Sequence, residues 1–196
     1  MEESCQVVAI DTDFLLHLTE MKDCDQVELS CRFFDALNFS PVISEFLHAN
    51  ELEPLSKIVE LFLKSKVLQV HYFVSGLNPG EKIYYENLVK DFYFRLNGVE
   101  YPFSTVFSEW RRGCNFGEVH SVAMCMLLQI SVFLSDDSDS KKIGIIVEDC
   151  AGENHRIKVL TRADAVAILT KDGRINRADR QKLTHRPKPE RGSQYD

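Results

Sequence analysis

Short apolar runs alternate with segments of helical periodicity along most of the chain. The runs at residues 6–10, 67–73, 131–135 and 156–160 are short and rich in Val, Ile, Leu and Phe, which predicts buried strands. Between them apolar residues recur at helical spacing, most clearly over residues 119–130. This alternation predicts an α/β domain with a mainly parallel central sheet flanked by helices on both faces.

Turn and capping residues predict where several helices begin and end. Ser40 and Pro41 are interpreted as the N-cap and first residue of a helix that runs to about Asn50. Asn97-Gly98 is expected to end a helix, and Thr161 with Asp164 resembles a capping box. The remaining expectations are helices after Thr12-Asp13 and from Pro54, a polar loop at 23–30, an irregular segment at 99–116, and helices at 141–150 and 177–183.

Composition indicates a globular protein. Of 196 residues, 44% are hydrophobic and 27% are charged, well away from a disordered composition. We expect a single domain over residues 1–184, with an extended helical segment at about 51–113, and a disordered basic tail at 185–196. No apolar run approaches the roughly 20 residues of a membrane helix. The six cysteines form no CxxC pair, which favours reduced thiols and a cytoplasmic location.

The charge is unevenly distributed. The net charge of −7 argues against a non-specific nucleic-acid coat protein, because phosphate binding requires Lys and Arg. Residues 171–191 nevertheless carry eight Lys or Arg against three acids, a net charge of +5 that leaves −12 on the rest of the chain. An acidic body with such a segment can still hold a polyanion if its acids are concentrated at a metal site.

Acidic residues follow two of the predicted strands. Asp11 and Asp13 come after the first, and Asp136, Asp137 and Asp139 come after the run at 131–135. In parallel sheets ligands bind at the carboxyl ends of the strands. Grouped carboxylates repel one another unless a divalent cation neutralises them, and oxygen ligands favour Mg²⁺ or Mn²⁺. For each acid alone, a helix-capping or solvated role is the competing interpretation.

Four stretches together resemble the PIN-domain family, in its Gly-Glu/Asp-Asp subgroup. They are VVAIDTDFLLHL, FSPVISEFLHANEL, NFGEVHSVAMCMLLQISVFLSDDSDSKKI and IKVLTRADAVAILTKDGRI. In the family an acid ends the first strand, a Glu lies on the second element, and a Gly-Glu pair opens an apolar helix that is followed by a strand and an Asp-Asp pair. The resemblance covers residues 6–50 and 114 to about 176.

The resemblance implies a Mg²⁺- or Mn²⁺-dependent nuclease, most often an endoribonuclease, and many PIN domains are toxins of toxin–antitoxin pairs. The implied partners are an RNA substrate, an antitoxin protein and a second copy in a homodimer, with no membrane. The family's acids correspond to Asp11, Glu45, Glu118 and Asp137, with Asp136 and Asp139 beside the last. The chain departs from the family in having Glu as the third acid and Ser-Asp-Ser-Lys-Lys after Asp137.

The implied mechanism is metal-assisted hydrolysis of a phosphodiester. Asp11, Glu118 and Asp137 are the expected metal ligands, with Asp136 and Asp139 as alternative or additional ligands beside Asp137. Glu45 is expected to be a ligand or to orient the water. Around them we expect Thr12, Asp13 and Ser135 to support the ligands by hydrogen bonds or charge. The residues expected to contact phosphate are Arg111, Arg112, Lys141 and Lys142.

Two other functions compete with this interpretation. Asp11-Thr12-Asp13 also resembles the DxD motif of haloacid-dehalogenase-type phosphatases, in which the first Asp attacks phosphorus and the second acts as acid and base. Ser135-Asp136-Asp137 resembles the late acids of that family, although Leu15 departs from its motif. Alternatively, the protein is a non-catalytic PIN-like module that binds nucleic acid or protein, in keeping with a net charge of −7 that weakens attraction of a polyanionic substrate.

Overall fold

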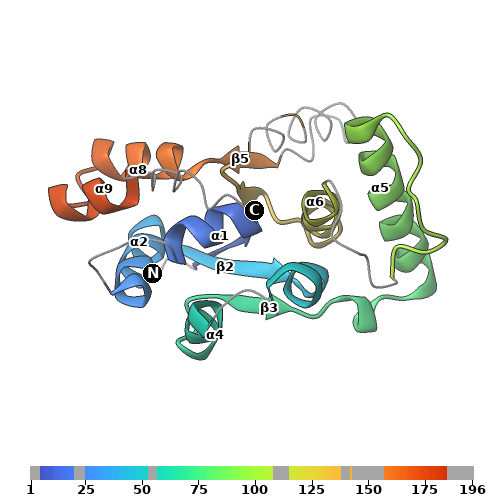
Figure 1. The fold of residues 1–196 in the computed structure, drawn as a ribbon, viewed down its shortest axis with the longest axis horizontal. Helices are drawn as coiled ribbons and strands as arrows, with labels where there is room; N and C mark the ends of the chain where they lie inside the picture. The colour runs from blue at the N-terminus through green and yellow to red at the C-terminus, as the bar shows by residue number, and fades with distance from the viewer. Residues whose placement is uncertain are drawn as a thin grey trace, which may run out of the picture.

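A five-stranded parallel sheet forms the centre of the molecule (Figure 1). The computed structural model describes residues 5–19, 25–52, 57–107, 115–137, 142 and 157–184. The strand order is β3-β2-β1-β4-β5, and each neighbouring pair is parallel. The strands are β1 (Gln6–Ile10), β2 (Phe39–Ser44), β3 (Gln69–His71), β4 (Val132–Leu134) and β5 (Lys158–Leu160).

Helices cover both faces of the sheet, which confirms the predicted α/β class. Along β1, the side chains of Val8 and Ile10 pack into one core, while Ala9 packs into the other. This alternation follows from the two-residue repeat of a strand buried on both faces. The first core contains α1 (Thr12–Thr19), α2 (Gln26–Leu37), α4 (Lys57–Lys64), α8 (Arg162–Lys171) and α9 (Arg177–Thr184), and the second contains α5 (Pro79–Asn97) and α6 (Phe116–Leu128). The remaining helical segments are α3 (Glu45–Leu47), the π-turn η1 (His48–Leu52) and the 3₁₀ turn η2 (Val74–Gly76).

The direction of the chain across the sheet reverses between β1 and β4. The chain steps from β1 to β2 to β3, then crosses to β4 on the other side of β1 and continues to β5. The carboxyl ends of β1 and β4 meet there, with Ile10 paired to Leu134 and the Asp11 N–H donating to the Leu134 carbonyl at 2.9 Å. In open α/β sheets ligands bind at such a reversal. The topology therefore indicates that a ligand site would lie at the carboxyl ends of β1 and β4.

Several local predictions are confirmed. The predicted strands at the start of the chain and at 131–135 are β1 and β4. The helix expected to end at Asn97-Gly98 is α5, and Gly98 caps it in the left-handed region at φ 68°. Thr161 and Asp164 form the predicted capping box of α8, with each side chain bonded to the other residue's backbone N–H.

Two local predictions are wrong. The expected helix start at Ser40 and Pro41 lies in β2, because Val42 and Ile43 are buried between the neighbouring strands. Pro41 is tolerated there because β3 pairs with β2 only from Val42 onward. The loop expected at 23–30 instead contains the start of α2, whose N-cap Asp25 accepts a hydrogen bond from the Glu28 N–H at 2.9 Å. The helix expected at 141–150, apart from helical Lys142, and the tail at 185–196 lie outside the described residues.

Candidate active site

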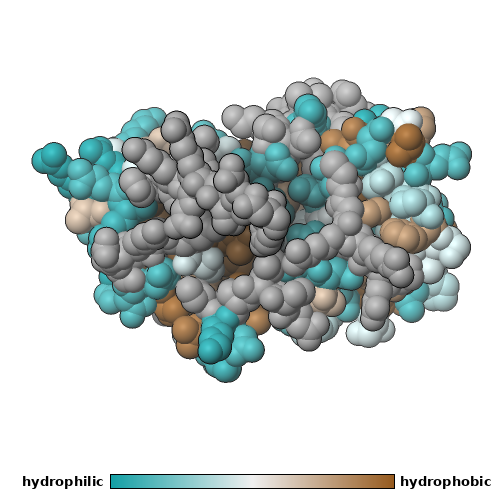
Figure 2. Space-filling view, in the orientation of Figure 1, coloured by the Kyte–Doolittle hydropathy of each residue, from teal (hydrophilic) through white to brown (hydrophobic). Residues whose placement is uncertain are grey.

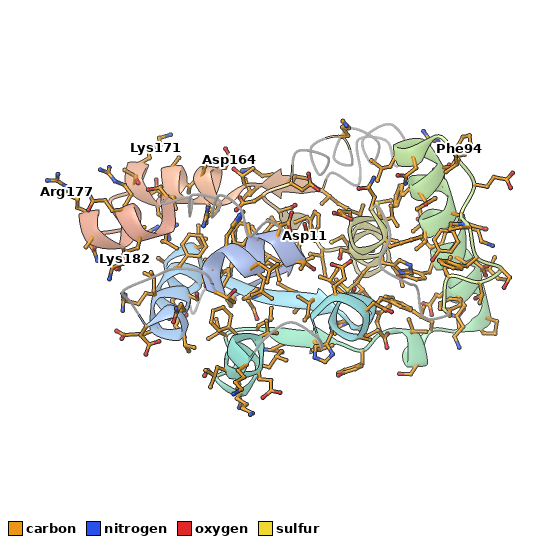
Figure 3. All side chains as sticks on the ribbon, viewed as in Figure 1. Asp11, Phe94, Asp164, Lys171, Arg177 and Lys182 are labelled. Carbon is orange, nitrogen blue, oxygen red and sulfur yellow. The ribbon has the colours of Figure 1, made fainter. Side chains whose placement is uncertain are left out.

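Asp11 lies at the reversal point, at the junction of β1 and α1. Its side chain is almost completely buried, with 2% of the residue exposed. One carboxylate oxygen accepts from the Thr12 backbone N–H at 2.7 Å, and the other accepts from the Ser135 hydroxyl at 2.9 Å. Because Ser135 follows β4, residues after both strands hold this carboxylate. Each oxygen keeps a second lone pair for a further partner. Figure 3 shows Asp11 between α1 and α6.

Glu118, in the first turn of α6, lies close enough to Asp11 for their charges to interact. Burial, then the charge of Glu118 and, more weakly, that of Glu51 raise the pKa of Asp11 well above its usual range. Burial first, and then the charges of Glu51, Asp137 and Asp13, raise the pKa of Glu118 to about 7. We refer to Asp11, Asp13, Glu51, Glu118 and Asp137 as the carboxylate cluster. Neighbouring carboxylates of this cluster thus disfavour ionisation of Asp11 and Glu118, as expected for like charges close together.

Glu51 is the member of the cluster that the sequence analysis missed. It lies on η1, and its carboxylate accepts a hydrogen bond from the Thr12 hydroxyl at 2.6 Å. A Cβ atom added at Gly117 would lie 2.5 Å from Oε1 of Glu51 and 2.7 Å from Cδ1 of Leu47. Gly117 therefore allows η1 to approach α6 closely. The Gly-Glu pair in the sequence indicates that another segment approaches the start of α6 closely, but it does not identify that segment as η1.

Glu45, which the sequence analysis placed in the catalytic set, has a different set of contacts. One of its carboxylate oxygens accepts from the backbone N–H groups of Phe73 at 3.1 Å and Val74 at 2.8 Å. These bonds fix the segment after β3 to the start of α3. Within the described residues, both of these hydrogen bonds of the Glu45 side chain are to the backbone after β3 and neither is to the carboxylate cluster. The structure thus gives Glu45 a role in holding the backbone, and it is Glu51 that lies beside Asp11.

Asp136 and Asp137 follow β4 but face different partners. Asp136 accepts from the Arg162 backbone N–H at 2.7 Å, and its other oxygen lies 2.7 Å from Nδ1 of His17 and 3.5 Å from Nε of Arg162. Asp136 thereby links β4 to α1 and α8. Asp137 donates its backbone N–H to the Ser135 hydroxyl at 3.2 Å, and its charge raises the pKa of Glu118.

Asp13, expected to support the ligands, is exposed at the start of α1. Burial of its carboxyl, then the charge of Asp137, raises the pKa of Asp13, with His17 acting in the opposite direction and Asp136 adding to the rise. The carboxylate of Asp13 therefore interacts with the charges of Asp137 and Asp136 from the solvent-exposed side of the site. This position agrees with a supporting role and gives it no direct contact with Asp11 among the hydrogen bonds of the described residues.

Most of the residues expected to contact phosphate lie outside the described residues. Asp139, Arg111, Arg112 and Lys141 lie outside the described residues, and Lys142 is exposed. Their roles stay predictions from the sequence.

The donors of the carboxylate cluster suit a hard divalent cation, since all of them are carboxylate oxygens. Their arrangement is more open than a coordination sphere: over the part of the chain that is described, no three His, Cys, Asp or Glu side chains are grouped so that they could hold a metal ion. The chemistry of the donors therefore fits Mg²⁺ or Mn²⁺, and binding would require the side chains to draw together.

Comparisons with family models, with curated proteins and with solved structures found no match for this chain. Within the described ranges, no helix combines the length and the apolar character that crossing a membrane requires. The fold and site thus define an α/β protein with a carboxylate cluster around the buried Asp11, at the reversal point of a parallel sheet.

Proposed function

We propose that this protein is a divalent-metal-dependent nuclease that hydrolyses phosphodiester bonds in RNA. The observation that carries the proposal is the carboxylate cluster, in which burial and the charges of acids from separate segments raise the pKa values of Asp11 and Glu118 at the carboxyl edge of the sheet. Carboxylates kept together in this way cost free energy unless a proton or a cation neutralises them. A site that retains this cost is more often functional than structural.

Asp11, Glu118 and Asp137 are the residues proposed to hold Mg²⁺ or Mn²⁺, with Glu51 in place of Glu45 as the fourth acid. When bound, such an ion lowers the pKa of a water and offsets charge on the phosphate. The hydroxyl of Ser135 fixes the Asp11 carboxylate and that of Thr12 fixes Glu51, so neither acid has to be ordered when the substrate arrives. The buried surroundings of Asp11 strengthen its interaction with any cation.

The PIN-like character of the chain is part of the same proposal. It is supported by the acid that follows β1, the Gly-Glu pair that opens α6, and the Asp-Asp pair that follows β4. An antitoxin partner and a homodimer are further consequences of that resemblance. They would be tested by co-purification and by measurement of the molecular mass in solution.

Incubation of the full chain with mixed single-stranded RNA tests the proposal directly. We expect fragments with Mn²⁺ or Mg²⁺ and none with EDTA. Metal binding without cleavage would instead identify a non-catalytic module. Trapping of a covalent aspartyl-phosphate with a phosphate analogue would identify a phosphatase of the haloacid-dehalogenase type.

Exchange of each Glu for Gln separates the two candidates for the fourth acid. We expect Glu51→Gln to lower cleavage roughly tenfold or more, since loss of a supporting carboxylate at a metal site typically costs 10–100-fold. Glu45→Gln keeps a carbonyl oxygen for the N–H groups of Phe73 and Val74, so it should leave cleavage within about threefold and lower stability by roughly 1 kcal/mol. Initial rates and urea unfolding measure both effects, and the reverse order would restore the original assignment of Glu45.

A further inference from the structure

Five cations gather at the end of the molecule formed by α8, α9 and the turn between them. We refer to Lys171, Arg174, Arg177, Arg180 and Lys182 as the cationic surface. All are exposed except Lys182, which is partly buried. Figure 3 shows Lys171, Arg177 and Lys182 projecting outward from the helices in different directions, and hydrophilic residues lie at this end of the face seen in Figure 2.

The acids of the same segment offset only part of the charge of the cationic surface, since Asp172 pairs with Arg174 whereas Asp179 pairs with a cation of α2. Asp179 is buried and accepts from the Arg32 guanidinium of α2 at 3.1 and 3.2 Å and from the Asn176 amide at 2.8 Å, so its charge is paired with α2. Asp172 lies 3.7 Å from Arg174. Within the described residues no ion pair involves Lys171, Arg177, Arg180 or Lys182. Residues 171–184 carry five cations and two acids in a chain of net charge −7.

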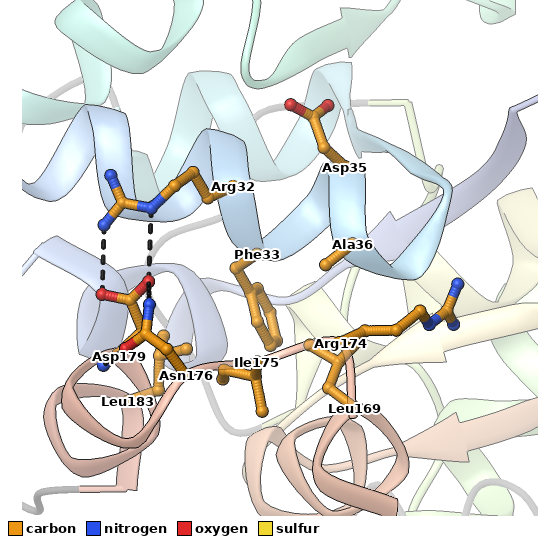
Figure 4. Close-up of a pocket in the computed structure, with 10 residues that line it drawn as sticks. All are labelled: Arg32, Phe33, Asp35, Ala36, Leu169, Arg174, Ile175, Asn176, Asp179 and Leu183. Atoms are coloured by element: carbon orange, nitrogen blue, oxygen red, sulfur yellow. Dashed lines mark hydrogen bonds and ion pairs between the residues drawn. The ribbon is translucent and has the colours of Figure 1, made fainter. Parts of the chain in front are cut away.

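A recess of about 310 Å³ opens beside these cations, between α2 and the α8–α9 pair (Figure 4). Apolar side chains line much of it, and the Arg32–Asp179 ion pair lies along one side. Its size is at the lower end of the range for small-molecule pockets. An acidic protein partner with a smooth surface could pair with the cations but would leave this recess unfilled. An unpaired base, with its flat apolar faces, can enter it while its backbone lies on the cations. The apolar part of the lining consists of Phe33, Ala36, Leu169, Ile175 and Leu183, and the polar part consists of Arg32, Asp35, Arg174, Asn176 and Asp179.

Lys171, the residue of the cationic surface at the end of α8, lies about one helix length from Asp136, which adjoins the carboxylate cluster. The first residue of α8, Arg162, donates its backbone N–H to Asp136, which adjoins Asp137. The last residue of α8 is Lys171, and ten residues at 1.5 Å rise span about 15 Å. The remainder of the chain is strongly acidic and repels a polyanion. A separate cationic surface offsets this repulsion without placing cations among the carboxylates.

We infer that the cationic surface and the adjoining recess bind single-stranded RNA, with the phosphates on the cations and an unpaired base in the recess. The identity of the polymer rests on the proposed nuclease function, whereas the binding site rests on the charges and the recess. RNA held here extends toward the carboxylate cluster, so this surface serves as a second, non-catalytic contact for the substrate.

Fluorescence anisotropy with labelled single-stranded RNA in EDTA tests binding without metal-dependent cleavage. The variant R177E/R180E/K182E should bind at least about tenfold more weakly, and the slope of log affinity against log salt should fall by roughly two, since each phosphate contact contributes about 0.7. The control K57E/K64E/K82E makes the same change in net charge on α4 and α5. It should bind within about twofold of wild type. Equal losses in the two triple variants would overturn the site.

A second variant tests the recess. Ala36→Phe should weaken binding of single-stranded RNA roughly threefold or more and leave binding of duplex RNA unchanged, since paired bases cannot enter. Ala36→Leu is a milder replacement if the larger side chain lowers the melting temperature. Unchanged binding by a folded recess variant would overturn the assignment of a base to the recess.

The binding and cleavage experiments fail separately. If the wild type binds RNA, R177E/R180E/K182E loses that binding and no cleavage is seen, the binding site is supported and the nuclease proposal is contradicted. Cleavage with no such loss of binding contradicts the surface alone. Tighter binding of polyglutamate than of RNA would show that the surface fits an acidic protein and would overturn the inference.

Discussion

Replacing Asp11 by asparagine is expected to reduce metal-dependent RNA cleavage at least about a hundredfold, since even residues that only support a metal ligand contribute 10–100-fold. The substitution keeps the shape of the side chain and removes the charge. Asp11 is the most deeply placed acid of the carboxylate cluster, with hydrogen bonds to the residues that follow β1 and β4. No solvent-exposed carboxylate can replace it. Initial rates in Mn²⁺ for wild type and D11N measure the effect.

The same substitution should not destabilise the metal-free protein. The asparagine carbonyl can accept from the Thr12 N–H, and the Ser135 hydroxyl can turn to accept from the amide. Removal of a buried charge beside Glu118 and Glu51 offsets the loss of the charged hydrogen bonds. Urea unfolding in EDTA at pH 8 should therefore give D11N a free energy of unfolding no lower than that of wild type. The matched control is Asp91→Asn on α5, which should cleave like wild type, because Asp91 is a partly exposed acid that pairs with Arg95 of the same helix. Cleavage by D11N at the wild-type rate would contradict the proposed site.

The sequence pattern predicts the sheet edge well because strand ends are local features. Asp11 follows an apolar run and Asp137 follows another, and parallel strands bring their carboxyl ends to one edge. Glu118 is equally accessible to prediction, because the helix it opens has the clearest periodicity in the chain. The principal acids of the candidate site could thus be found without coordinates.

The choice between neighbouring acids depends on long-range packing that no local pattern contains. Asp136 forms hydrogen bonds with His17 and Arg162, which are distant from it in the chain. Asp137 is therefore the acid of this pair that belongs to the carboxylate cluster. Glu51 reaches Asp11's neighbour Thr12 only because η1 is a wide π-turn and Gly117 lacks a side chain. Because Ser40 and Pro41 are interpreted as the start of a helix, residues 48–52 are expected in the last turns of that helix and not in the separate π-turn η1. A helix in place of β2 necessarily points Glu45 and Glu51 in the wrong directions.

The carboxylate cluster should also make the stability of the metal-free protein fall as the pH rises. The pKa of Glu118 is about 7 in the folded protein against an ordinary value of 4.5, and that of Asp11 is also raised. Near neutral pH the folded state therefore binds more protons than the unfolded state, so the free energy of unfolding decreases with pH. This contribution is fully present below the ordinary pKa and is lost as the pH passes the folded one. From pH 6.5 to 8 the decrease should be roughly 1–2 kcal/mol.

The window above pH 6.5 is chosen because of the buried His120. Burial lowers its pKa to about 3, so below its ordinary value of 6.5 the unfolded state takes up a proton that the folded state does not. Its contribution therefore falls as the pH is lowered, opposite in sign to that of the carboxylates. Above pH 6.5 this imidazole is largely neutral in both states. The slope there reports mainly on the carboxylate cluster.

Urea unfolding at pH 6.5, 7.2 and 8 in EDTA, with and without Glu118→Gln, measures the slope. The glutamine should flatten it, because it removes one titrating group and relieves Asp11 of a neighbouring charge. Mn²⁺ should oppose the decrease, since an ion that binds the ionised carboxylates stabilises the folded state more as they lose their protons. Glu45→Gln, which leaves the carboxylate cluster intact, should keep the wild-type slope. A metal-free stability that rises from pH 6.5 to 8 would mean that these acids do not share a buried edge, and the proposed site would lose its physical basis.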